Sequence, residues 1–167
     1  MVKGIVSGPQ ELPVRLDPLV DFEDRLVSGT LTHNGIQYSQ EVTTAGAGVE
    51  MAAFSKLVDP LVEGRILWVE LELVAEFRAV SSPTADLTWR WQARNGDGSW
   101  LDLHEPVLEA NIGTAYVART RGGCFTPQPD FDSVPCEIRL VISCDEANQG
   151  RARVTNRSHA RVVYRVI

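Results

Sequence analysis

Two stretches of strict alternation between apolar and polar side chains constrain the fold of this chain more than any other feature. The first runs from Ile66 to Val80 and the second from Leu87 to Asn95. A period of two is that of a β-strand with one buried face. The sequence therefore predicts two long strands. Their apolar positions are Leu67, Val69, Leu71, Leu73, Ala75, Phe77 and Ala79 in the first strand, and Leu87, Trp89, Trp91 and Ala93 in the second.

The two strands can be joined in two ways. If they pair directly as a hairpin, one allowed register sets Phe77 opposite Trp89 and Glu76 opposite Arg90. The same register sets Ala75 opposite Trp91 and Glu72 opposite Arg94, so that large side chains meet small ones on the core side and acids meet bases outside. A Greek-key connection instead places the two strands in opposite sheets. Both arrangements are compatible with the sequence.

Further strand signals follow along the chain. Asn34-Gly35 lies between two alternating runs, which is a strong hairpin signal because both turn residues must take positive φ. Residues 114–121 and 136–144 have strand character, and the last 18 residues are typical of two strands about a turn at 156–158. Residues 47–64 alone show competing helical spacing, which favours a short helix or a connection. We expect an all-β fold, an antiparallel β-sandwich or jelly roll, with at most one short helix.

The chain has the length of one ordinary domain. With 167 residues it can bury a core without disulfide bridges. Residues 1–22 carry Pro9, Pro13 and Pro18 and little periodicity, so we expect an extended N-terminal arm that lies on another surface, such as that of a neighbouring subunit. Residues 23–167 then form a single β-sandwich domain.

Composition excludes several classes of function. The formal net charge is −6 and the arginines are not clustered, so nucleic acid is not an expected partner. There is no stretch of about 20 apolar residues and no signal-peptide pattern, so we expect a leaderless, soluble protein that does not contact membranes. The odd number of cysteines argues against a disulfide framework, and we expect Cys124, Cys136 and Cys144 to be buried thiols. No cofactor or metal site is expected.

The sequence contains no strong catalytic signature. Glu70, Glu72 and Glu76 share one strand face, which fits a solvated sheet face better than the paired carboxylates of a jelly-roll glycoside hydrolase. The run from Asn95 to Ser99 indicates a β-turn in preference to a calcium loop, because position 106 is Pro where such a loop needs an acid. We therefore expect no catalytic residues and no enzyme.

Two tryptophans are candidate ligand-binding residues. Trp89 and Trp91 belong to the apolar strand face and are expected in the core. Trp68 lies on the mixed face and Trp100 beside a turn, so these two indoles can be exposed platforms for a sugar ring. A carbohydrate-binding module is thus one functional alternative, and a glycoside hydrolase on the same scaffold is a weaker one.

The second half of the chain resembles the jelly-roll domains of virion surface proteins, especially phage capsid-decoration and tail-associated modules. The resemblance is carried by strand order and texture in LTWRWQARNGDGSWLDL, TAYVARTR, CEIRLVISC and RVVYRVI. It implies a non-catalytic structural protein with an N-terminal arm, which forms a homo-oligomer, with a trimer favoured, and docks on a larger protein shell. The expected location is the virion, or the cytoplasm when the protein is expressed alone.

Overall fold

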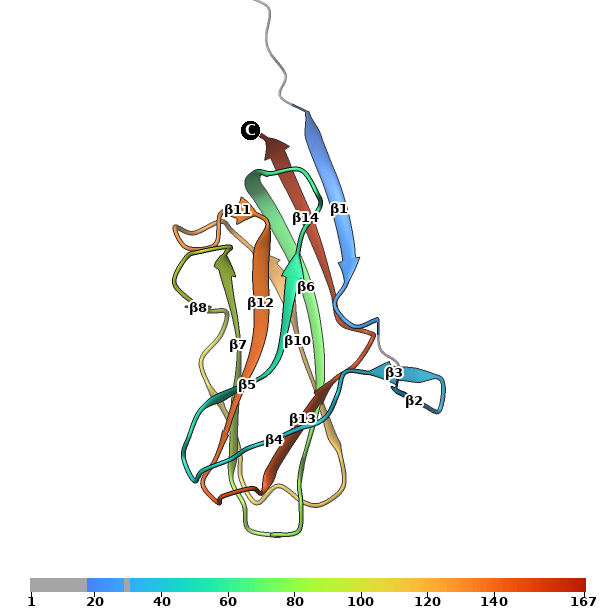
Figure 1. The fold of residues 1–167 in the computed structure, drawn as a ribbon, viewed down its shortest axis with the longest axis vertical. Coiled ribbons are helices and arrows are strands. Elements are labelled where there is room, and N and C mark those ends of the chain that lie inside the picture. The colour runs from blue at the N-terminus through green and yellow to red at the C-terminus, as the bar shows by residue number, and fades with distance from the viewer. Residues whose placement is uncertain (1–17, 29–30) are drawn as a thin grey trace, which may run out of the picture.

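Two antiparallel β-sheets packed face to face form the protein (Figure 1). The computed structural model describes residues 18–28 and 31–167. The predicted all-β sandwich is confirmed, and the described residues contain strands but no helix, hence no helix able to cross a membrane. Residues 1–17 of the expected arm lie outside the described residues, whereas residues 19–22 already belong to the first strand.

The larger sheet has seven strands and is organised around its longest member, β6. The strands β14 and β13 lie end to end along one side of β6, while β10 and β11 lie along its other side. The strand β1 then pairs with β14, and β4 with β13. The bounds are β1 Leu19–Arg25, β4 Val42–Thr43, β6 Gly64–Ala79, β10 Val117–Phe125, β11 Ser133–Val134, β13 Gly150–Val154 and β14 His159–Val166.

The smaller sheet has five strands, and a separate hairpin projects from the body. In the smaller sheet β12 lies between β5 and β7, and the short strands β8 and β9 pair with β7. The predicted turn at Asn34-Gly35 is confirmed, because both residues have positive φ, 50° and 77°, between β2 and β3. The bounds are β2 Leu31–His33, β3 Ile36–Tyr38, β5 Met51–Val58, β7 Leu87–Asn95, β8 Leu101–Asp102, β9 Val107–Glu109 and β12 Cys136–Cys144.

The two long predicted strands are β6 and β7, and they lie in different sheets. Of the two connections, the one that places them in opposite sheets is therefore correct. Phe77 still meets Trp89, but by stacking across the sandwich with ring centroids 5.0 Å apart. The acid-base pairs of the hairpin register do not form, since Glu76 instead binds Arg153 at 2.7 Å.

The short helix or connection expected within residues 47–64 is wrong, because this region contains β5. Leu140 and Val141 of β12 pair with Phe54 and Ala52, so Ala53 is an extra residue in the ladder. Such a β-bulge interrupts the period of two. It turns both Ala53 and Phe54 towards the core, which produces the three- and four-residue apolar spacing that resembles a helix.

A second β-bulge changes which residues of β6 face the core, so the predicted apolar face is wrong at Leu67. Trp68 pairs with Val163, and Ile66 with Tyr164, so Leu67 is the extra residue. As a result Ile66 is buried and Leu67 is 44% exposed, although the alternation placed Leu67 in the core. The bulge adds an exposed apolar side chain next to Trp68.

The turn at 156–158 joins two collinear strands. Ser158 is fully buried; its hydroxyl accepts a hydrogen bond from Val74 N–H at 2.8 Å and donates one to Val74 C=O at 3.1 Å. The serine thus satisfies the β6 backbone where β13 ends and β14 begins. Among the cysteines, Cys136 and Cys144 are buried as expected, and burial raises the pKa of Cys136 to about 12. Cys124 is exposed, because it lies on the edge strand β10, so its predicted burial is wrong.

His104 holds the segment between β8 and β9 against β7. Its Nε2 accepts a hydrogen bond from Trp91 N–H at 3.0 Å, and its Nδ1 lies 2.7 Å from the Glu105 carbonyl. A neutral ring with the proton on Nδ1 satisfies both contacts. Burial lowers the pKa of His104 below its usual 6.5, and the positive charge of Arg121 lowers it further.

We predict an acid-dependent loss of stability through His104. The folded chain resists protonating this ring, so its contribution is complete above about pH 6.5 and is lost as the pH falls below that value. Urea unfolding at pH 7.5 and pH 5 measures the loss. In His104→Gln the neutral amide can make both hydrogen bonds at either pH, so this variant should lose less stability. Equal losses in the two proteins would contradict the assignment.

Candidate assembly surface

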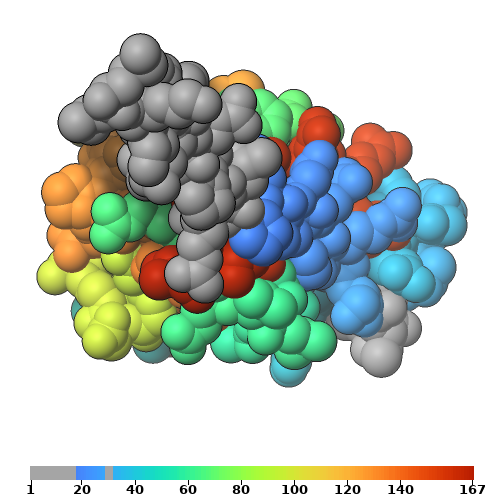
Figure 2. Space-filling model, turned by 90° about the horizontal axis from the view of Figure 1, so that it is seen from above, coloured from blue at the N-terminus to red at the C-terminus, as the bar shows by residue number. Residues whose placement is uncertain are grey.

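One end of the sandwich brings together the first described residue, the C-terminus and three connections between strands. It is the end at which β1 begins and β14 stops (Figure 1). Val166 N–H donates to Pro18 C=O at 3.1 Å, and Ile167 N–H to Glu63 C=O at 3.4 Å. Figure 2 looks down on this end, where the connection before β6, the C-terminal residues and the loops around β8 and β11 meet.

Exposed apolar side chains gather at this end. Of the eight large hydrophobic residues that are exposed in the described part of the chain, five lie here: Leu19, Leu61, Val62, Leu67 and Ile167. Leu61 is 90% exposed and Ile167 is 86% exposed. Single exposed apolar residues are ordinary, but a concentration of them marks an interaction surface. We call these five residues the apolar end.

The backbone holds Leu61 in a conformation that displays its side chain. Leu61 has a φ of 67°, and its N–H donates to Asp59 Oδ1 at 2.9 Å. A left-handed conformation costs a residue with a Cβ roughly 1 kcal/mol or more. Strain of this kind concentrates at functional positions.

A groove of about 350 Å³ adjoins the apolar end. One of its walls is fixed by Asn95, whose Oδ1 accepts hydrogen bonds from Asp132 N–H at 2.9 Å and Ser133 N–H at 3.1 Å. Gly98 N–H also bonds to Asn95 C=O at 3.2 Å, so the predicted β-turn is present. The groove is lined by Glu63, Gly64, Gly96, Asp97, Ser133, Val134, Pro135 and Ile167.

Trp68 lies on the outer face of the seven-stranded sheet, next to the exposed Leu67. Its indole is half-buried, with the Arg161 guanidinium 5.6 Å from the ring centroid. Arg161 is itself held by Asp21 through two hydrogen bonds of 2.9 and 2.7 Å. The hydrogen bond from Arg161 lowers the pKa of Asp21. The ion pair with Asp21 therefore holds the Arg161 guanidinium in place beside the Trp68 ring.

Trp100 lies on the other sheet, so the structure does not bring the two predicted ligand-binding tryptophans together. The guanidiniums of Arg139 and Arg94 lie 3.8 and 4.3 Å from its ring centroid. These arginines occupy ring surface that a stacked sugar needs. A sugar platform is accordingly better accommodated at Trp68 than at Trp100.

The three carboxylates of β6 are spread over a solvent-facing surface. Glu76 is engaged by Arg153, while Glu70 and Glu72 lie 3.9 Å from Arg161 and His159. Each acid thus has a basic neighbour. Within the described residues, no group of three or more His, Cys, Asp or Glu side chains is arranged to hold a metal ion.

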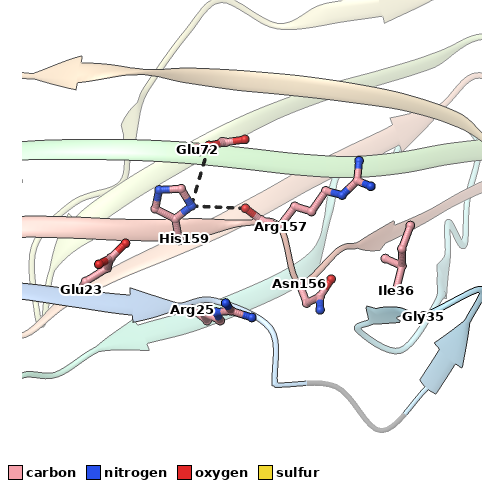
Figure 3. A pocket seen from close by; sticks show the side chains of 8 residues that line it. All are labelled: Glu23, Arg25, Gly35, Ile36, Glu72, Asn156, Arg157 and His159. Atoms are coloured by element: carbon pink, nitrogen blue, oxygen red, sulfur yellow. Dashed lines mark hydrogen bonds and ion pairs between the residues drawn. The ribbon is translucent and has the colours of Figure 1, made fainter.

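A second cavity of about 780 Å³ lies between the same sheet and the β2–β3 hairpin (Figure 3). His159 is one of its lining residues and lies 3.9 Å from Glu72 and 3.3 Å from the Arg157 carbonyl. Charges of both signs line the cavity, so it has no marked preference for one kind of ion. Its lining residues are Glu23, Arg25, Gly35, Ile36, Glu72, Asn156, Arg157 and His159.

The sequence pattern does not indicate the apolar end. Leu61 and Val62 lie in the region where a short helix or connection is predicted, and Leu67 lies on the predicted apolar face of its strand. One signal was available, because Leu61 and Val62 follow Pro60 directly, where a turn is expected and apolar side chains are not. The role of Ile167 depends on where the last strand ends, which periodicity alone does not determine.

Comparison with known proteins supports the fold. No protein-family model and no curated protein matches the sequence. A chain of the T13 particle of infectious bursal disease virus superposes with a TM-score of 0.55 and 10% identity over 88% of this chain and 31% of that one. The Gx strain of that virus gives 0.49, with 11% identity over 90% and 37%. A xylan-binding module gives 0.42, with 15% identity over 90% and 100%.

This chain thus spans about a third of the length of the viral chains it matches. At such low identity the similarity concerns the fold. The expected resemblance to jelly-roll proteins of the virion surface is confirmed at that level: the chain is an antiparallel β-sandwich that resembles viral capsid proteins.

Proposed function

We propose that this chain is a non-catalytic assembly protein of a virion, which self-associates through its apolar end and docks on a larger protein shell. The observation that carries the proposal is the concentration of exposed apolar side chains at one end of the sandwich. Removing apolar surface from water stabilises an interface by about 25 cal/mol per Å². The capsid-type fold favours the same function, and the resemblance implies a trimer as the oligomer.

The rest of the described surface favours this location for the contact. The outer faces of both sheets carry ion pairs such as Arg161–Asp21, Arg153–Glu76 and Arg94–Glu137. Such pairs are satisfied within one molecule and contribute little when exposed. Within residues 18–28 and 31–167 the apolar end has no comparable internal partner, so a second protein surface would stabilise it most.

Charging the apolar end should weaken self-association. In the double variant Leu61→Asp/Val62→Asp, two carboxylates would have to be desolvated in the contact, so we expect at least a tenfold rise in the dissociation constant. Light scattering after size-exclusion chromatography measures it. Leu108→Asp is a matched control, because Leu108 is 60% exposed on β9. If the double variant assembled as well as Leu108→Asp, the apolar end would not be the contact.

We further propose that residues 1–17 strengthen the contact as an arm laid on a neighbouring subunit. Because β1 begins at Leu19, a truncation that keeps the sheet intact must stop at residue 17. We expect the truncated chain to melt at the same temperature as the full chain but to associate more weakly. A Gly/Ser segment of equal length in place of residues 1–17 controls for chain length. Undiminished association of both proteins would remove the arm from the proposal.

The second candidate is a carbohydrate-binding module, favoured by the half-exposed Trp68 beside polar Glu70 and Arg161. If this is the function, Trp68→Ala abolishes binding to a plant polysaccharide panel in affinity electrophoresis, whereas Trp100→Ala, whose ring is covered by arginines, retains most of it. An unmodified chain that binds none of the polysaccharides would eliminate this candidate.

A further inference from the structure

The outer face of the five-stranded sheet carries one arginine, Arg139, that has no acidic partner among the described residues. We call Arg90, Arg94, Arg139 and Trp100 the arginine face. Arg90 binds Glu50 at 2.6 and 2.9 Å, and Arg94 binds Glu137 at 2.8 and 3.0 Å. No carboxylate of the described residues lies within 4 Å of Arg139.

Arg139 is held in place and yet has free donors. Its Nε donates to Gln92 Oε1 at 2.7 Å, and Gln92, which is only 6% exposed, donates in turn to Asp102 at 2.6 Å. The guanidinium lies 3.8 Å from the centroid of Trp100. In the described part of the chain its two Nη groups have no hydrogen-bond partner. A fixed guanidinium fork of this kind is suited to binding a carboxylate through two parallel hydrogen bonds.

The surroundings of Arg139 favour the binding of an anion. Burial lowers its pKa, and the positive charges of Arg94 and Arg90 lower it further, while Glu137 and Glu50 act in the opposite sense. A nearby carboxylate would relieve this unfavourable environment. The face is formed by side chains of β7 and β12 and by Trp100, which precedes β8, and neither cavity described above lies in it. Small free ligands prefer concave sites, so the carboxylate is better supplied by another protein surface.

The apolar end has the complementary charge. Asp59, Glu63, Asp97 and Asp130 are all exposed on its connections, and no basic group of the described residues lies within 4 Å of them. Glu63 and Asp97 line the groove together with Ile167. Arg65 and Arg165 are exposed and stand opposite each other in β6 and β14, and Arg165 is also opposite Leu19, so the basic residues of this end lie on the outer face of the seven-stranded sheet. The end thus carries its acids on the connections around the groove and its bases on the sheet face.

We propose that the apolar end of one copy docks on the arginine face of a second copy, with Arg139 receiving a carboxylate from Glu63 or Asp97. This inference rests on the proposed self-association. Leu57 of β5 lies on the same outer sheet face as Arg139 and is 49% exposed. It offers apolar surface to Leu61 of the docking copy. Because the two surfaces differ, each copy offers its end and its face to other copies. Such contacts close into a two-fold dimer or a larger ring, such as the trimer that the resemblance implies, or continue as an open chain.

A charge exchange tests the contact with full-length protein. Arg139→Glu alone and Glu63→Lys/Asp97→Lys alone should each weaken self-association at least tenfold, because like charges then meet. The chain that carries all three substitutions should recover most of the loss, because opposite charges meet again. Arg157→Glu is the matched control, since Arg157 lies outside both surfaces. Sedimentation velocity gives the dissociation constants, and thermal melting verifies that each variant folds.

The outcomes separate this inference from the function on which it rests. An unmodified chain that is monomeric at every concentration overturns both. A self-associating chain in which Arg139→Glu behaves like Arg157→Glu overturns the arginine face alone. Losses in the combined variant that simply add, without recovery, also overturn the pairing. Arg139→Lys provides a second check if Arg139→Glu fails to fold: it keeps the charge but loses the fork, and should weaken association by a smaller factor.

Discussion

The packing of β6 against β7 and β12 is the interaction on which the rest of the structure depends. The inner face of β6 is buried from Val69 to Ala79, and Phe77 stacks on Trp89 across the two sheets. Every other strand of the larger sheet is attached to β6 directly or through one neighbour. Because β6 has partners on both sides along most of its length, it offers no free strand edge there.

The free edges of β10 and β5 are protected against strand addition. On β10, Arg119 points inward and binds Glu109 of the opposite sheet at 2.6 Å. On β5, the bulge at Ala53 interrupts the ladder and Lys56 reaches Asp24 at 3.8 Å. Inward charges, bulges and short strands are the usual protections of an edge. Assembly through the end of the sandwich needs no free strand edge.

The sequence predicted the parts of the fold that follow from local periodicity. The strands β6, β7 and β12, the Asn34-Gly35 turn and the sandwich class were all correct, because a period of two and positive-φ turns are local properties. Sheet membership of β6 and β7 was left open, because Phe77 and Trp89 are compatible with pairing side by side or stacking face to face. The sequence does not reveal the two bulges. At β5 the extra residue produces an apolar spacing like that of a helix, and at β6 the apolar and polar residues still alternate through the extra residue.

The candidate site was predicted only in part. Trp68 was correctly placed on the outer face, beside what proved to be the apolar end. The isolation of Arg139 depends on which acids reach Arg90 and Arg94 in space, and the sequence does not contain that information. Self-association is best measured as the solution mass of the unmodified 167-residue chain across a range of concentrations. We expect a closed oligomer, a trimer, that dissociates on dilution; a monomer at every concentration would contradict assembly through the apolar end.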